Sequence, residues 1–164
     1  MAACSLMCLT TCGGVPLFTR NKGTKRPLPF PLIGTLNGVQ MFAASRDMEL
    51  QSTTTENSKV FWKVFQNSIT LILITDDYSI SDCHIGNFLR IIFNVIVFFC
   101  GQEDVANIKN PERFKNEIKV CFKLIDDLMN QVSSATFSAM TNTVEIITGP
   151  DCIPLQASLD HAVL

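Results

Sequence analysis

The residues of this chain that are most able to do chemistry are its two histidines and seven cysteines. His84 directly follows Cys83, and a thiol beside an imidazole can supply a nucleophile and its base. Neighbouring side chains on a helix, however, point about 100° apart. We therefore interpret Cys83 and His84 as the start of a helix and predict no catalytic pair there.

Three cysteines near the N-terminus, Cys4, Cys8 and Cys12, raise the question of a zinc site. Structural zinc sites favour closely spaced cysteine pairs held in turns, with two further ligands. Cys4 and Cys8 fall inside a predicted strand, so we predict that they pack as small apolar residues. Two acids, Asp76 and Asp77, could bind a cation, but a helix-capping loop explains them more simply.

No motif of a familiar enzyme class is present in the sequence. It contains no dinucleotide-binding glycine fingerprint, no phosphate-binding loop and no paired histidines of a zinc protease. We therefore predict a non-catalytic chain with no cofactor and no metal.

A short basic cluster contains Arg20, Lys22, Lys25 and Arg26. Clusters of this size commonly form solvated surface, which is one interpretation. The alternative is contact with anionic lipid, because a basic loop on a peripheral domain is attracted to negatively charged head groups.

Bulk composition narrows the class of protein. The chain has 164 residues, of which 47% are hydrophobic and 17% charged, and this is typical of one packed globular domain. A formal net charge of −2 disfavours nucleic-acid binding, which needs a basic surface. The odd, scattered cysteines indicate free thiols of a cytosolic protein rather than a secreted disulfide framework. Met1 to Thr11 lacks the basic start of a signal peptide, and the apolar run Phe88 to Cys100 is shorter than the about 20 residues of a membrane span.

The elements that must position these residues begin with a hairpin and a helix. Ala2 to Leu9 and Val15 to Arg20 are predicted strands, joined by a glycine turn. A helix is predicted to begin near Pro31, since the first helical turn tolerates proline. The apolar residues at helical spacing that we expect to face the sheet are Leu32, Leu36, Val39 and Ala43.

Two glycines, Gly34 and Gly38, lie four residues apart on another face of this helix. Each costs about 1 kcal/mol in helix propensity. Close approach of another backbone is the compensation that we expect there.

Three strands should follow. Met48 to Thr54 is polar and suits an edge strand, and Val60 to Phe65 alternates. Ile69 to Ile74 is apolar on both faces and is predicted to be the central strand. Short polar turns between these segments indicate an antiparallel meander.

The last two predicted helices are Ile85 to Gly101 and Asn110 to Gln131. A polar stripe should be the only exposed face of the first of them, and it consists of Asn87, Arg90 and Asn94. The second has an N-cap, a first-turn proline and a first-turn acid at its start.

The predicted order is therefore β-β-α-β-β-β-α-α. Residues 1–131 should form one α/β domain, a five-stranded antiparallel sheet with helices on both faces. Residues 132–164 are predicted to be a connector or a truncated tail.

This order is that of longin domains, which have a profilin-like fold, and the sequence resembles one family of them over nearly the whole chain up to Gln131. The longest matching runs are Gly14 to Arg20 (GVPLFTR) and Leu28 to Phe42 (LPFPLIGTLNGVQMF). The shorter matches are Thr55 to Asn57, Trp62 with Lys63, Ser68 to Ile72, Asn107 to Asn110 and Leu124 to Asp126. The resemblance is to the first longin domain of the Fuzzy family of planar cell polarity effectors.

That resemblance implies a role in planar cell polarity and cilium assembly, in the cytoplasm at the cilium base and its cytoskeleton. The family works in an assembly with Inturned and a WD-repeat effector. The longin domain would pair with that of Inturned, and the pair would promote nucleotide exchange on a ciliary Rab-family GTPase. Such exchange needs no catalytic acid or base, because partner contacts remodel the switch regions of the GTPase.

By the same resemblance, pairing would use the first helix and the adjacent edge strand. The positions implied are Gly34, Leu36, Asn37, Gly38, Met41, Glu49 and Gln51. The alternative is a non-catalytic trafficking scaffold whose longin fold recruits coat or membrane components.

Overall fold

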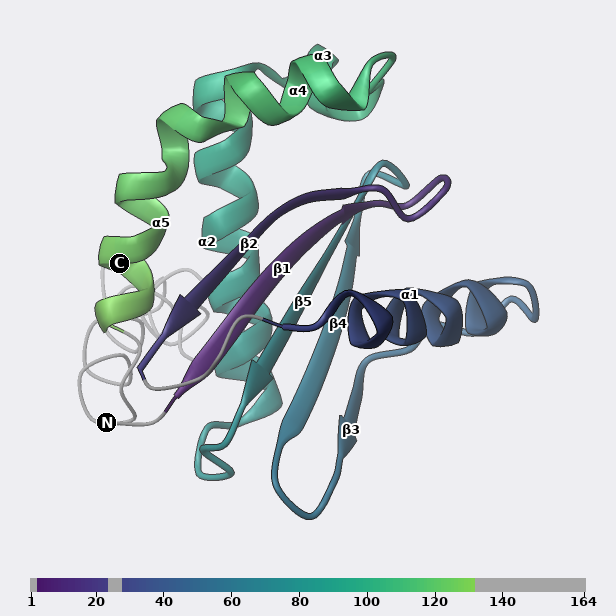
Figure 1. The fold of residues 1–164 in the computed structure, drawn as a ribbon, viewed down its shortest axis with the longest axis vertical. Coiled ribbons are helices and arrows are strands. Elements are labelled where there is room, and N and C mark those ends of the chain that lie inside the picture. The colour runs from purple at the N-terminus through teal and green to yellow at the C-terminus, as the bar shows by residue number, and fades with distance from the viewer. Residues whose placement is uncertain (1–2, 24–27, 132–164) are drawn as a thin grey trace, which may run out of the picture. The chain divides into compact units, whose positions relative to one another are not determined.

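The sheet of this protein carries helices on both of its faces (Figure 1). A computed structural model describes residues 3–23 and 28–131, so the predicted connector, residues 132–164, lies outside the described residues. The five strands are β1 (Cys4–Thr10), β2 (Pro16–Lys22), β3 (Ser52–Thr54), β4 (Lys59–Phe65) and β5 (Ile69–Thr75). They are ordered β2-β1-β5-β4-β3 and every neighbouring pair is antiparallel. The predicted fold class is confirmed.

The central strand is β5, as the sequence predicts. All seven of its residues are buried, because β1 and β4 flank it and helices cover both faces. The predicted edge strand is shorter than expected: only Ser52–Thr54 pairs with β4.

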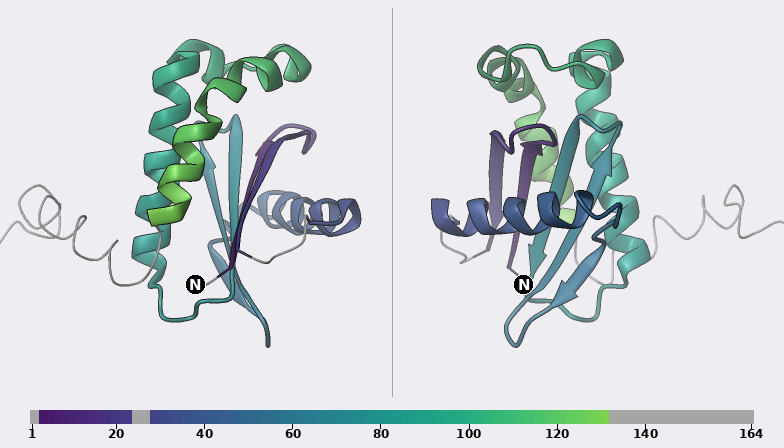
Figure 2. Two further views of the ribbon diagram at one scale, coloured as in Figure 1. Left: turned by 60° about the vertical axis from the view of Figure 1, so that its left-hand side comes forward. Right: turned by 90° about the vertical axis from the view of Figure 1, so that its right-hand side faces the viewer.

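One helix, α1 (Phe30–Ala44), lies on the first face of the sheet and connects β2 at one edge to β3 at the other (Figures 1 and 2). Its buried residues are Leu36, Gln40 and Ala43. The core beneath it is formed by Met7, Leu9, Leu36, Val60, Trp62, Ile72 and Ile74. These strand residues alternate along β1, β4 and β5, as a face packed against a helix requires.

The predicted inner face of α1 is wrong at two positions. Leu32 and Val39 are exposed, whereas Ile33 packs against the core and Gln40 is buried. The helix is apolar on several sides, so hydrophobic spacing alone does not identify the face that meets the sheet.

The second face carries a long helix, α2 (Asp82–Cys100), and a helical segment that returns along the sheet (Figure 2). The elements that follow α2 are α3 (Gln102–Ala106), α4 (Pro111–Glu117), the 3₁₀ turn η1 (Ile118–Cys121) and α5 (Phe122–Gln131). The sequence predicts one helix from Asn110 to Gln131, but η1 interrupts it, and α3 was not expected.

The predicted end of the long helix at Gly101 and the predicted N-cap at Asn110 are confirmed, whereas α2 begins at Asp82, three residues before the predicted Ile85. Ser81 caps α2 by accepting a hydrogen bond from the His84 backbone N–H (3.3 Å), and Gly101 ends it with a φ of 88°. Asn110 caps α4 by accepting from the backbone N–H groups of Glu112 and Arg113 (3.1 Å each). These side chains satisfy donors that have no partner inside the helix.

Helix α2 has the length and composition of a membrane span, with 19 residues and a mean hydropathy of 1.7 over its most apolar window. It is longer than the apolar run Phe88 to Cys100 because it begins at Asp82. Core helices of globular domains pass the same test, and α2 packs against β4, β5 and η1.

The expectation that a polar stripe is the only exposed face of α2 is wrong. Arg90 and Asn94 are exposed, but so are Phe98 (82% exposed) and Phe99, near the end of the helix. The two phenylalanine rings pack edge to face, with centroids 5.3 Å apart.

Candidate partner-binding site

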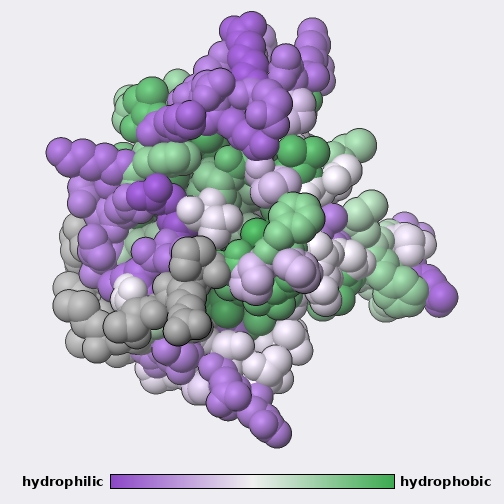
Figure 3. Space-filling view, in the orientation of Figure 1, coloured by the Kyte–Doolittle hydropathy of each residue, from purple (hydrophilic) through white to green (hydrophobic). Residues whose placement is uncertain are grey.

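The side of α1 that points away from the sheet is apolar and exposed. At about 100° per residue, Phe30, Gly34, Gly38 and Met41 fall in one row opposite the buried Leu36, with Phe42 beside them. Phe30 is 75% exposed and Phe42 is 60% exposed. We call these five residues the outer face of α1. In the space-filling view, apolar side chains extend along this helix and polar atoms gather at its far end (Figure 3).

The two glycines leave the middle of the outer face open. A Cβ atom built on Gly34 or Gly38 meets no atom within 4 Å. The close approach of another backbone that we expected there is therefore not made within the described residues. A second molecule could therefore approach the helix backbone at the two glycines. The exposed apolar side chains around them are typical of a protein-binding surface.

One predicted interface residue, Leu36, belongs to the core instead. It is 8% exposed, and its carbonyl oxygen accepts a hydrogen bond from the indole N–H of Trp62 at 3.4 Å. It lies on the side of α1 that faces β4, so a partner on the outer face cannot contact it.

Asn37 is half-buried and lies against the turn of the β1–β2 hairpin. A Cβ on Gly14 would be 2.0 Å from the Asn37 side-chain nitrogen, so glycine at that turn leaves room for the Asn37 side chain. The Asn37 amide also donates to the sulfur of Met41 at 3.3 Å. Asn37 therefore holds the Met41 side chain and lies against the hairpin turn, and it is not itself one of the residues of the outer face.

The two remaining predicted residues, Glu49 and Gln51, line a different hollow. They border a groove of about 330 Å³ between the middle of β4 and the start of α2, together with Lys63 and Asn87. The carbonyl oxygen of Gln51 accepts from the Trp62 backbone N–H at 2.7 Å, and this bond ends the pairing at that edge.

The sheet edge beside this groove is only partly covered. Strand β3 pairs with β4 from Lys59 to Phe61, so β4 from Lys63 to Phe65 has no strand neighbour on that side among the described residues. Unpaired strand edges can extend a sheet into a neighbouring molecule.

Sequence reasoning missed the most exposed apolar residues of this site, Phe30 and Phe42. A signal was present, because α1 carries more apolar residues than one buried face can hold. Met48, just before β3, is a further exposed apolar residue.

Two residues of the basic cluster, Arg20 and Lys22, lie in strand β2 and contact α5. Arg20 forms a two-pronged ion pair with Asp126 of α5, and its guanidinium lies 4.9 Å from the centre of the Phe122 ring. Hydrogen bonding to Asp126 raises the pKa of Arg20, so it stays charged. Lys22 is buried and donates to the Asn130 carbonyl at 3.0 Å. Lys25 and Arg26 lie outside the described residues, so the lipid contact stays a prediction.

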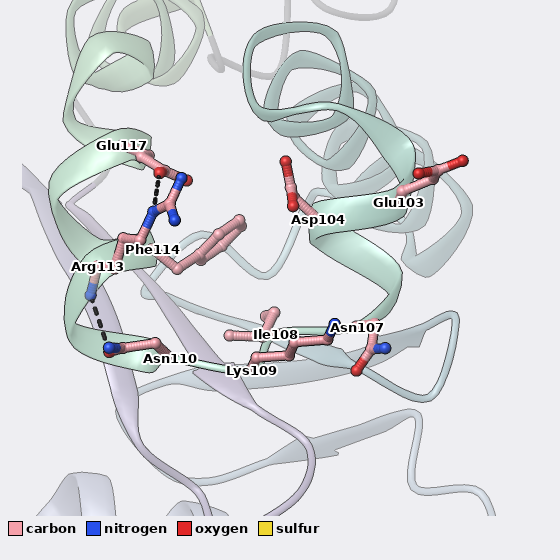
Figure 4. Close-up of a pocket in the computed structure, with 9 residues that line it drawn as sticks. All are labelled: Glu103, Asp104, Asn107, Ile108, Lys109, Asn110, Arg113, Phe114 and Glu117. Carbon is pink, nitrogen blue, oxygen red and sulfur yellow. Dashed lines mark hydrogen bonds and ion pairs between the residues drawn. The ribbon is translucent and has the colours of Figure 1, made fainter.

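A third hollow, of about 280 Å³, lies between α3 and α4 (Figure 4). Its charged side chains have both signs: Arg113 pairs with Glu117 at 2.7 Å, and Asp104 faces the same space. The Phe114 ring closes its inner wall. No charged side chain at this hollow is buried, which makes it a poor candidate for catalysis.

The histidine and cysteine side chains that could do chemistry have structural roles in the fold. The His84 ring lies 2.8 Å from the hydroxyl of Ser81, within the cap of α2. Cys4 and Cys8 are buried in β1, and burial raises the pKa of Cys8. Within residues 3–23 and 28–131, no three histidine, cysteine or acidic side chains cluster as metal ligands.

Comparison with known proteins gives this arrangement a family. Residues 4–128 match the model of the first longin domain of FUZ, MON1 and HPS1. The chain belongs to that longin family. The match runs from the first residue of β1 into α5, so this longin domain includes both the outer face of α1 and the edge at β3.

Several curated proteins are similar to this longin domain. Protein fuzzy homolog of Xenopus tropicalis is 40% identical over 156 residues, which is 95% of this chain and 37% of that protein. The proteins of the same name from Homo sapiens and Mus musculus are 37% and 35% identical, each over 158 residues. This chain therefore spans less than two-fifths of the length of the relatives that it matches, and 94% of its own residues take part in each of the last two matches.

Proposed function

We propose that this longin domain acts as one half of a heterodimer whose other half is the longin domain of Inturned. The open, apolar outer face of α1 is the observation that supports this pairing. Phe30, Met41 and Phe42 are large apolar side chains at the surface, and Gly34 and Gly38 leave room for a partner between them. Exposed apolar side chains around a recess are typical of an interface core.

The uncovered edge of β4 supplies a second element of the proposed interface. Backbone hydrogen bonds along Lys63 to Phe65 would fix the register of a partner strand, while the outer face of α1 would supply apolar burial. Glu49 and Gln51 border the groove beside that edge, where they would contact the partner as rim residues.

The pair would act in planar cell polarity and cilium assembly, with a WD-repeat effector in the same assembly, at the base of the cilium. It would promote release of nucleotide from a Rab-family GTPase. The similarity to proteins named fuzzy homolog supports this assignment. Exchange of this kind proceeds by remodelling of the GTPase switch regions, so it would use partner contacts and no catalytic acid or base.

Two measurements test the proposal in sequence. Size-exclusion chromatography of the chain mixed with the Inturned longin domain should show a 1:1 complex, and two separate peaks would contradict the pairing. Release of fluorescent GDP from the Rab GTPase should then be faster with the pair than with either domain alone. A stable pair that leaves GDP release unchanged would instead indicate a trafficking scaffold.

A further inference from the structure

Two cysteines meet where the end of α2 packs against η1. Cys100 is the last residue of α2, and Cys121 is the last residue of η1. Their side chains are in hydrogen-bond contact, although a long stretch of chain separates them. Helix α2 and the helical segment that contains η1 lie on the opposite face of the sheet from α1 (Figure 2), so the proposed partner surface does not involve this pair.

The fold brings this pair together through several local features. Gly101, with a φ of 88°, ends α2 and turns the chain into α3. The helical segment that Asn110 starts then crosses the end of α2, and η1 makes close contact with it. The tighter 3₁₀ turn places Ile118 and Cys121 inward, where both are fully buried.

The two thiols differ in exposure and in ionisation. Cys121 is buried, whereas Cys100 is half-buried and opens the pair to small solutes. The hydrogen bond from Cys100 stabilises a thiolate on Cys121, which lowers the pKa of Cys121 and raises the pKa of Cys100. A thiol with a lowered pKa that contacts a second thiol is susceptible to oxidation, because the second thiol can resolve the oxidised sulfur as a disulfide.

We propose that Cys100 and Cys121 form an oxidative modification site, at which a peroxide joins α2 to η1 by a disulfide bond. One sulfur attacks an oxygen of hydrogen peroxide, the O–O bond breaks, and the first water leaves with the thiol proton. The resulting sulfenic acid is attacked by the other sulfur, and the second water carries away the sulfenic oxygen and the second thiol proton. Two thiols are oxidised to one disulfide as one peroxide is reduced to two waters.

The other described cysteines are placed differently. Cys8 is buried inside β1 and its pKa is raised, so it is poorly reactive. Cys83 is exposed in the first turn of α2, at the opposite end of the helix from Cys100. Cys83 therefore serves as a matched exposed control.

The test treats the full 164-residue chain with one equivalent of hydrogen peroxide and digests it with trypsin under non-reducing conditions. Cleavage after lysine and arginine leaves Cys100 as the one cysteine of peptide 91–109 and Cys121 as the one cysteine of peptide 120–123. We expect these peptides to appear as a linked species lighter than their sum by two hydrogens. It should exceed every other disulfide about tenfold and disappear on reduction by dithiothreitol.

Variants decide between this pair and general thiol oxidation. Cys100→Ser should abolish the linked species, and Cys83→Ser should leave its yield unchanged. Sulfenic or sulfinic acid on Cys100 without the linked peptide would overturn the proposal. So would disulfides that mainly involve Cys83, or scrambled disulfides with no preferred pair.

Discussion

Individual residues of α1 divide between the core and the solvent without regard to polarity. Gln40 is buried, and its side-chain oxygen has no hydrogen-bond partner among the described residues. Phe42, two residues further along the same helix, is 60% exposed. A buried acceptor without a hydrogen-bond partner destabilises the folded state. An aromatic ring left in water gives up the stabilisation that its burial would provide. Both costs are consistent with a helix whose sequence serves a second surface as well as its own core.

Gln40→Met is expected to stabilise the domain. The substitution keeps the length of the side chain and removes the unpartnered acceptor, so the free energy of unfolding in urea should rise by about 1 kcal/mol. Gln51→Met, at an exposed position, should change it by less than about 0.5 kcal/mol. A loss of stability in Gln40→Met would show that the amide oxygen is satisfied in solution.

Asp82 predicts a dependence of stability on pH. Hydrogen bonds from Lys59 and from Ser52 lower its pKa below the ordinary value of 3.8. Because the folded state holds the charged form, the contribution of Asp82 to stability is present above about pH 3.8 and is lost as the pH falls through the lower folded-state pKa.

Asp82→Asn should therefore destabilise the domain at pH 7 and much less in acid. The Asp82 side chain is nearly half exposed, so solvent screening limits the loss at pH 7 to about 0.5 kcal/mol. Urea unfolding at pH 7 and pH 3, with Asp76→Asn as an exposed control, measures the difference. An equal loss at both pH values would exclude the ion pair as its source.

At the scale of elements, the cap of α4 carries a clear expectation. Asn110 satisfies two backbone donors, and α4 leads directly into η1. Asn110→Ala should lower the free energy of unfolding by about 1 kcal/mol, measured by urea denaturation. Asn110→Ser, which keeps an oxygen acceptor at the cap, should restore most of it; equal losses in both variants would mean that the amide has another role.

Much of the fold follows from local patterns in the sequence. The apolar run Ile69 to Ile74 marks the central strand because only a strand covered on both faces can bury both of its sides. Glycines and capping residues mark the hairpin turn and the starts of α2 and α4. These signals depend on near neighbours along the chain, which the sequence shows directly.

The features that the sequence does not show depend on tertiary contacts. The buried face of α1 contains Gln40 in place of Val39, because the helix rotates to pack Ile33 and Leu36 on Trp62. Of the predicted interface, Gly34, Gly38 and Met41 are brought together, Leu36 is buried, and Glu49 and Gln51 line a separate groove. The contact of Cys100 with Cys121 likewise requires the packing of η1 on α2.

For the molecule as a whole, the two faces of the sheet differ in what covers them. Among the described residues, the second face is covered by α2 and α5 together, whereas α1 is the one helix on the first face (Figures 1 and 2). The apolar outer face of α1 and the uncovered edge of β4 are the surfaces left for a partner. We therefore expect a partner to complete the first face.

The most direct test of a partner on the outer face of α1 is the Gly38→Arg variant. Isothermal titration calorimetry compares its affinity for the Inturned longin domain with that of the unmodified chain. No atom lies within 4 Å of a Cβ at Gly38, and arginine favours helix, so thermal unfolding should be unchanged or shifted upward. The charged side chain would fill the recess of the outer face, and the dissociation constant should rise about 100-fold or more.

Two variants control this measurement. Asn94→Arg, exposed on α2 across the sheet, should bind as the unmodified chain does. Leu36→Ala should lower stability by about 2–5 kcal/mol through the cavity that it leaves in the core. Unchanged affinity in a folded Gly38→Arg variant would contradict the pairing surface on α1.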